Sequence, residues 1–337
     1  NPPGHHCRNS TMALTQRAAR HLVPRITCKS AFRSLSSGSA NPVPLLPNHR
    51  VHLLFGANTD VGKSIVSTGL VRAAASSQHY ASVNYIKPLQ CGGSDESFVL
   101  RHRNDDKEKC TTKDSYGESD INCQTLFRWE TPASPHLASR WENLPVSDDE
   151  VLSSLQSSLK NIDGIAESST GDGMSSITII ESAGGVLSPS SSSPLNKSTT
   201  ESNWGWSTQA DLYAPLNIPL IFVGDGKLGG ISVTLASLEA LWSRGYRVDA
   251  VVFIEGVDGD SSDDESSIQF GKGNTEALRE YITMQLHNVP KVGLNHVKRK
   301  ASILDQDSII CLPSLPPMPV PLDDWYENNQ EEFLKLH

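Results

Sequence analysis

One stretch of the chain combines glycines, a lysine and hydroxyl residues at a spacing that suits phosphate binding: FGANTDVGKS, residues 55–64. It ends in GKS, as the common phosphate-binding loop G-x-x-x-x-G-K-[ST] does. The first glycine of that pattern would stand at position 57, which is Ala57, and the glycine is Gly56 instead. The loop therefore has one residue more between its glycines than the general pattern.

Around the second glycine, backbone N–H groups can converge on an oxygen anion, helped by the positive end of the helix that follows. Lys63 would supply charge to the phosphates, and Ser64 would offer its hydroxyl to Mg²⁺. An apolar run, VHLLF, precedes the loop and a helical pattern follows it, as this motif requires. The residues expected to contact a nucleotide here are Asp60, Val61, Gly62, Lys63, Ser64 and Ile65.

Charged residues also follow two other apolar runs. Lys87 ends the strand predicted at 82–88, and Glu181 ends the strand predicted at 176–181. Ligands of parallel sheets bind at the carboxyl ends of the strands, so both side chains should lie beside the phosphate loop. There Lys87 could stabilise charge in phosphoryl transfer and Glu181 could bind magnesium. The residues next to Glu181 that should also contact nucleotide are Ser182, Ala183 and Gly184.

A second magnesium ligand is less clearly marked. Asp95 opens a short helical stretch and could be a ligand or only the cap of that helix. Asp105 and Asp106 compete for the metal role, and the SDESFV context favours Asp95.

Further segments supply the elements that must position these residues. Strands are predicted at 51–55, 82–88, 176–181, 218–225, 249–255 and 308–313, and helices after 63, at 150–162, 231–244 and 274–289, the last capped by Asn274 or Thr275. Strands that alternate with helices and are apolar throughout favour a parallel sheet covered on both faces. We therefore predict an α/β fold: one doubly wound, mostly parallel domain of the P-loop NTPase type.

The expected domain runs from 48 to 330, with 331–337 as a C-terminal tail or linker. Polar, low-complexity segments at 167–176, 188–203 and 256–267 should be solvated loops. Residues 1–47 contain several arginines among Ser, Ala and Leu and no acidic residue, which is typical of a mitochondrial transit peptide leading to the matrix, although a disordered basic tail is the alternative.

Composition narrows the class of protein. A net charge of −9 gives no reason to expect nucleic-acid binding, and no apolar run is long enough to span a membrane. The six cysteines form no C-x-x-C pair, so reduced thiols are expected rather than zinc or a disulfide framework.

Five motifs in series resemble dethiobiotin synthetase: GANTDVGKS, YIKPLQCG, TPASPH, IIESAGG and VGDGKLGGIS. Their wording is most similar to the synthetase half of the eukaryotic bifunctional enzyme, in which it is fused to diaminopelargonic acid aminotransferase. The chain is then either a fragment of such an enzyme or a free-standing synthetase, and the resemblance implies a homodimer.

The resemblance implies that ATP, Mg²⁺, CO₂ or bicarbonate and 7,8-diaminononanoate meet in one site and give a cyclic urea through a carbamate and a carbamic-phosphoric anhydride. It assigns catalytic roles to Lys63, Lys87 and Thr59. Substrate contacts fall to Thr59 and Cys91, where Cys91 replaces the family's hydroxyl. The implied magnesium ligands are Ser64, Asp95 and Glu181.

Nucleobase preference stays open, because the family's adenine-reading Asn has no counterpart in IEGVDGD. Two alternatives share the loop. Another P-loop amidoligase would need a glutaminase domain with a nucleophilic Cys, and none is visible in the sequence. A nucleotide-switch ATPase would carry an extra lysine early in the loop, and none precedes Gly62 there. A degenerate synthetase domain is disfavoured by the joint presence of Lys63, Ser64, Lys87 and Glu181.

Overall fold

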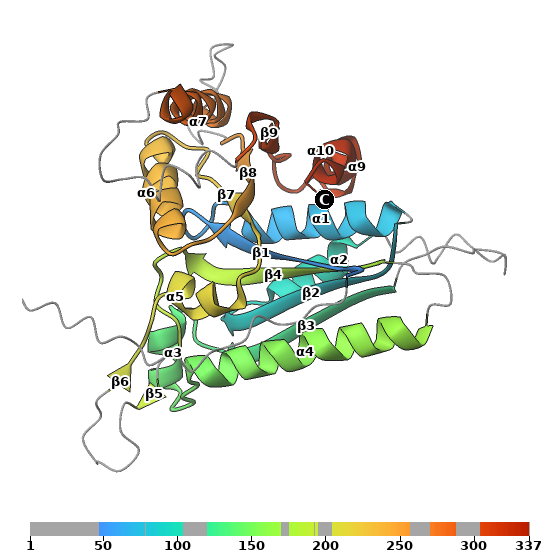
Figure 1. The fold of residues 1–337 in the computed structure, drawn as a ribbon, viewed down its shortest axis with the longest axis vertical. Coiled ribbons are helices and arrows are strands. Elements are labelled where there is room, and N and C mark those ends of the chain that lie inside the picture. Colours follow the sequence, from blue (N-terminus) through green and yellow to red (C-terminus); the bar gives the residue numbers. More distant parts are fainter. Residues whose placement is uncertain are drawn as a thin grey trace, which may run out of the picture. The chain divides into compact units, whose positions relative to one another are not determined.

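The computed structural model describes residues 47–77, 79–103, 120–169, 175–191, 193–194, 204–256, 270–287 and 304–336, which all belong to one compact unit (Figure 1). Its centre is a parallel seven-stranded sheet in the order β3-β2-β4-β1-β7-β8-β9. The strands are β1 (His49–Gly56), β2 (Tyr80–Cys91), β3 (Asp120–Trp129), β4 (Ser175–Gly185), β7 (Leu220–Val223), β8 (Val248–Ile254) and β9 (Ile309–Leu312). The predicted α/β class with a mostly parallel sheet is confirmed.

Helices cover both faces of the sheet, because the central strands are apolar on both sides. Leu53 and Phe55 of β1 face one core, and Leu54 between them faces the other. The second core lies under α1 (Lys63–Ser76), α2 (Asp95–His102), α9 (Asp323–Asn328) and α10 (Gln330–Leu334). The first core lies under α3 (Pro135–Trp141), α4 (Asp148–Ser169), α5 (Gln209–Tyr213), α6 (Gly230–Ser243) and α7 (Phe270–His287). Figure 1 shows α1, α9 and α10 on the side of the sheet opposite α4.

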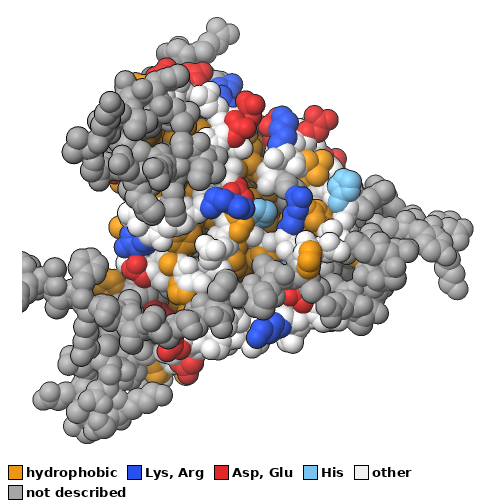
Figure 2. Space-filling view, in the orientation of Figure 1, with side chains coloured by type: hydrophobic (Ala, Val, Ile, Leu, Met, Phe, Trp, Pro, Cys, Tyr) orange, Lys and Arg blue, Asp and Glu red, His pale blue; other side chains and the backbone are white. Residues whose placement is uncertain are grey.

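Smaller elements complete the described part: the short antiparallel pair β5 (Ser193–Pro194) and β6 (Trp204–Gly205), and the 3₁₀ turns η2 (Ala214–Leu216) and η3 (Gln306–Ser308). Acidic and basic side chains are interspersed on the face seen in Figure 2. Among the residues described, no helix is both long and apolar enough to cross a membrane.

The structure differs from the predicted elements in several places. β3 was not predicted, and α7 begins at Phe270, so Asn274 and Thr275 lie inside the helix rather than at its cap. Residues expected to form a tail after 330 instead form α10 and pack against α1 through the buried Phe333.

The polar segments lie partly outside the described residues, as do the leader up to residue 46 and the alternatives Asp105 and Asp106. At the start of the second polar segment, Ser190 and Ser191 are buried rather than solvated. The Ser191 hydroxyl donates to the carbonyl of Val146, which holds this segment to the domain.

Candidate active site

The loop between β1 and α1 folds tightly over its first glycine. A Cβ on Gly56 would lie 2.8 Å from Cγ2 of Val61 and 3.0 Å from the side chain of Lys63. Gly62 takes φ 92° and Asp60 takes φ 59°, so two residues of the loop adopt left-handed backbone conformations just before α1 begins. A glycine is therefore needed at 56, where the loop lies close, and Ala57 is accommodated at the position where the general pattern has its glycine.

Lys63 is nearly buried, and its Nζ donates to the carbonyl oxygen of Asn58 at 3.1 Å. Burial lowers the pKa of Lys63 to about 8; Glu181 opposes this shift and Lys87 adds to it. The Lys63 ammonium is thus held over the loop. Because burial disfavours its charge, an anion bound beside it would be favoured.

Glu181 was predicted to end its strand but lies inside β4, before its end at Gly185, and its carboxylate accepts hydrogen bonds from Ser64, Ser67, Tyr85 and Lys87. Its side chain is fully buried, and Oε1 accepts from Ser64 Oγ and from Lys87 Nζ, both at 2.9 Å. Oε2 accepts from Ser67 Oγ at 2.7 Å and from the Tyr85 hydroxyl at 3.1 Å. One carboxylate therefore joins the phosphate-loop helix α1 to strand β2.

Lys87 lies between two carboxylates. Its Nζ is 2.6 Å from Asp95 Oδ2, 2.9 Å from Glu181 Oε1 and 3.1 Å from the carbonyl oxygen of Ser182. Burial would lower the pKa of Lys87, but the two carboxylates outweigh burial and raise it above its usual value. The residue is therefore a fixed cation at the sheet edge.

The cap of α2 is Ser94, whose side chain accepts from the backbone N–H of Ser97. This leaves the Asp95 carboxylate turned towards Lys87, so the interpretation of Asp95 as the N-cap is wrong.

These residues fit a magnesium ion in donor type. The Ser64 hydroxyl donates to the Glu181 carboxylate, and the Lys87 ammonium contacts the carboxylates of both Glu181 and Asp95. Hydroxyl and carboxylate oxygens therefore lie together around a cation, the ammonium of Lys87. Hard oxygen donors are what Mg²⁺ prefers. No group of three or more His, Cys, Asp or Glu side chains converges in the described ranges, so an ion here would take its remaining ligands from water and phosphate.

A cavity of about 900 Å³ opens beside this network. It extends from the loop residues to the carboxyl end of β2, the start of α2 and the segment 132–135. The predicted residues that line it are Thr59, Asp60, Gly62, Lys63, Ser64, Ile65, Lys87, Cys91, Asp95, Glu181, Ala183 and Gly184.

Two predicted contacts do not line the cavity. Val61 packs against the apolar cores, and Ser182 is buried with its carbonyl oxygen accepting from Lys87. At the β2 end of the cavity, burial raises the pKa of Cys91 to about 12, so its sulfur is a protonated thiol.

Several residues around the cavity were not assigned from the sequence. Ser67 lies inside α1 and carries no motif signal, whereas Tyr85 opens the YIKPLQCG motif, which could have indicated it. Phe98, Ser134 and Ser188 line the cavity. Ser134 belongs to the TPASPH motif, which could have indicated it, whereas Phe98 looks like any apolar helix residue in the sequence.

The chain is similar to several known proteins. Residues 50–291 match a family model described as AAA domain. A mitochondrial bifunctional dethiobiotin synthetase/7,8-diamino-pelargonic acid aminotransferase of Arabidopsis thaliana is 33% identical over 291 residues, covering 72% of this chain and 32% of the relative. The protein of the same name from Oryza sativa is 34% identical and covers 59% of this chain and 27% of the relative.

An ATP-dependent dethiobiotin synthetase BioD of Phenylobacterium zucineum is 26% identical and covers 65% of this chain and 81% of that protein. These names confirm the resemblance that the motifs indicated. The chain spans about a third or less of the length of the two plant relatives, at 32% and 27%.

Proposed function

The chain belongs to the AAA domain family, and from that premise we propose that it is an ATP-dependent dethiobiotin synthetase of biotin biosynthesis. The observation that carries the proposal is the placement of two buried lysines, Lys63 and Lys87, around the Glu181 carboxylate at one end of a large cavity. One lysine is at the phosphate loop and the other faces the cavity from β2.

The proposed reaction has three steps. An amine nitrogen of 7,8-diaminononanoate adds to CO₂ and loses a proton to give a carbamate. A carbamate oxygen then attacks the γ-phosphorus of ATP, and ADP leaves. The second amine attacks the carbonyl carbon, which closes the cyclic urea and releases phosphate. Positioning and charge neutralisation are the main demands of this chemistry.

Roles follow from placement. Lys63 and the backbone N–H groups of the loop would hold the β- and γ-phosphates, and Lys87 would neutralise the carbamate and the transferring phosphoryl group. Thr59 and Cys91 would contact the diamine. Ser64, Asp95 and Glu181 would hold magnesium, which supplies charge neutralisation at the phosphate oxygens.

Assembly and location belong to the same proposal. The plant relatives are named mitochondrial, which supports a matrix location for this protein. The homodimer is proposed from the family resemblance alone, and the bifunctional names of the relatives support fusion or association with the aminotransferase.

The test is phosphate release from MgATP by the full chain, with ¹³C-bicarbonate and 7,8-diaminononanoate added together or omitted singly. We expect release only when both are present, with the label in the ureido carbon of the product by mass spectrometry. Phosphate release at the same rate without the diamine would show that the protein is an ATPase of another kind.

A further inference from the structure

The helices α9 and α10 lie directly on the helix that follows the phosphate loop. The Phe333 ring packs flat on α1 at Gly69, where an added Cβ would lie 2.1 Å from Cζ of the ring. Trp325, Tyr326 and Phe333 are all buried and form edge-on or tilted ring contacts with one another. The C-terminal segment is thus built into the core under α1.

The Tyr326 hydroxyl reaches the first turn of α1. It donates to the carbonyl oxygen of Ile65 at 3.3 Å. The Thr68 hydroxyl donates to the carbonyl oxygen of Ser64 at 2.7 Å in the same turn. These carbonyls belong to the two residues that follow Lys63, so α9 is bonded to the turn that presents the lysine and hydroxyl of the site.

Arg72, two turns further along α1, joins three helices. Its guanidinium donates to the carbonyl oxygen of His102 at the end of α2 and to Asp323 Oδ1 of α9 at 3.0 Å. It also lies over the Tyr326 ring, 5.1 Å from the centroid. The Arg72 side chain is 5% exposed, whereas the Asp323 side chain that it contacts is 53% exposed.

Of the three helices that Arg72 joins, α1 and α2 begin at the cavity. α1 presents Lys63 and Ser64 there, and α2 presents Asp95, about 10 Å along its axis from the His102 carbonyl at 1.5 Å per residue. A small change of angle at the Arg72 end would therefore be transmitted to the Asp95 end as a displacement towards or away from Ser64.

We propose that Tyr326 and Arg72 are positioning residues of the nucleotide site: through them the C-terminal helices set the placement of α1 against α2. This proposal depends on one part of the proposed function, namely that the site binds MgATP. Tyr326 acts on the phosphate loop, and Arg72 acts on the separation between Asp95 and the Ser64–Glu181 pair.

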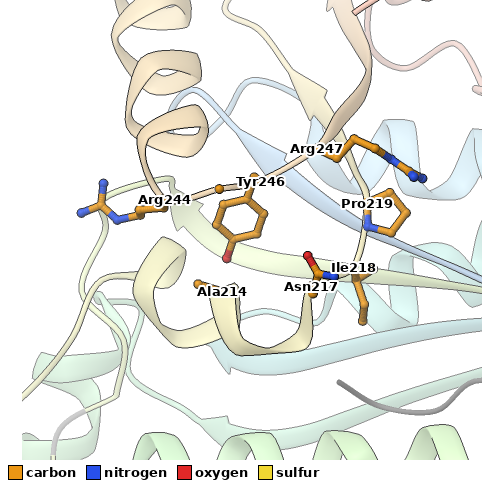
Figure 3. A pocket seen from close by; sticks show the side chains of 8 residues that line it. Ala214, Asn217, Ile218, Pro219, Arg244, Tyr246 and Arg247 are labelled. Carbon is orange, nitrogen blue, oxygen red and sulfur yellow. The ribbon is translucent and has the colours of Figure 1, made fainter. Parts of the chain in front are cut away.

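The test compares Tyr326→Phe and Arg72→Met with Tyr246→Phe as the matched control. Tyr246 is also a buried tyrosine whose hydroxyl donates to a backbone carbonyl, that of Ala210, at 2.8 Å. It lines a separate cavity of about 250 Å³ at the starting ends of β7 and β8, the edge opposite the nucleotide site (Figure 3). The charged neighbours there, Arg244 and Arg247, already pair with Asp211 and Asp249.

We expect Tyr326→Phe to weaken MgATP binding about fivefold by calorimetry, the equivalent of one net hydrogen bond, with kcat and the KM for the diamine nearly unchanged. Arg72→Met should raise the Mg²⁺ concentration for half-maximal nucleotide binding, and Arg72→Lys should restore part of the loss. Tyr246→Phe should lose comparable thermal stability and bind MgATP like the wild type.

If Tyr326→Phe and Tyr246→Phe lose equal stability and both bind MgATP like the wild type, the C-terminal helices are only structural and the inference is overturned. Binding is measured without diamine or bicarbonate, so a wild type that binds MgATP but forms no urea would refute the proposed function and leave this test intact. Tyr326→Phe keeps the aromatic ring and its packing. It therefore tests the role of the C-terminal helices even if Arg72→Met does not fold.

Discussion

At the residue scale, Lys87 is held in place by two ion pairs. Two carboxylates contact its ammonium, and Glu181 keeps three hydroxyl donors besides it, from Ser64, Ser67 and Tyr85. The carboxylate would therefore stay solvated by hydroxyl groups when the lysine is removed, and the phosphate loop would keep its anchor.

Lys87→Ala should lower kcat about 10²- to 10³-fold, the cost of removing one preorganised electrostatic donor, with little change in the Kd for MgATP. Steady-state phosphate release and calorimetric binding measure the two quantities. Lys160→Ala, which removes an exposed lysine of α4, is the control and should change neither. Equal losses of binding and turnover would contradict the role given to Lys87.

At the element scale, the start of α7 is set by the residue that follows strand β8. Glu255 follows β8 and is almost buried, and its two oxygens accept from the backbone N–H groups of Gly271 at 2.8 Å and Lys272 at 2.9 Å. Inside the helix, the Asn274 amide donates to the carbonyl oxygens of Asp225 and Lys227 and so holds the glycine-rich turn after β7.

Glu255→Gln should lower the free energy of unfolding by about 1–2 kcal/mol, because the charged cap at the positive end of α7 is lost. Thermal or urea unfolding measures the change. Glu276→Gln, an exposed substitution on the same helix, should leave stability within about 0.5 kcal/mol of the wild type. A similar loss in both variants would mean that Glu255 is not the cap that matters.

The elements that could be predicted from the sequence are those with a local signal. ITII has three isoleucines around Thr178 and LIFV is apolar throughout, and these segments lie in the central strands β4 and β7. β3 was missed because DINCQTLFRW carries polar residues at many positions, which an edge strand with one neighbour tolerates. The cap of α7 was misassigned because its acceptor, Glu255, is distant in sequence, and sequence patterns report near neighbours.

The residues of the candidate site also divide into those with a signal in the sequence and those without one. Lys63, Lys87 and Glu181 could be placed together because each was predicted to end or follow a strand of one parallel sheet. In the structure Lys87 and Glu181 lie inside the longer strands β2 and β4, still beside the loop that carries Lys63. Ser67 contacts Glu181 only through the packing of α1, so no spacing in the sequence marks it, and the place of Tyr85 in the YIKPLQCG motif does not by itself show that its hydroxyl donates to Glu181.

At the scale of the whole molecule, stability should depend on pH through buried histidines. His49 Nδ1 lies 2.6 Å from Asp163 Oδ1, and its Nε2 lies 2.8 Å from Thr178 Oγ1, which ties α4 to β1 and β4. Burial lowers the pKa of His49 below its usual value of 6.5, more than Asp163 raises it. Burial also lowers the pKa of His52.

Because the unfolded chain then binds more protons than the folded one, stability should fall as the pH drops below 6.5 towards the folded pKa. His49→Gln should make this dependence shallower, and the remainder should come from His52, His102 and His136, whose pKa values burial also lowers. Urea unfolding at a series of pH values measures the slope. An unchanged slope in the variant would show that His49 does not titrate between the folded and unfolded states.

The strand order has a consequence for biosynthesis. β1 carries the phosphate loop, yet its two neighbours, β4 and β7, begin only at Ser175 and Leu220. On a ribosome, which releases the amino end first, the loop sequence emerges long before either strand that will hold it, and parallel pairing over such separations forms slowly. We therefore expect the sheet edge that carries the candidate site to form only after Leu220 has left the exit tunnel.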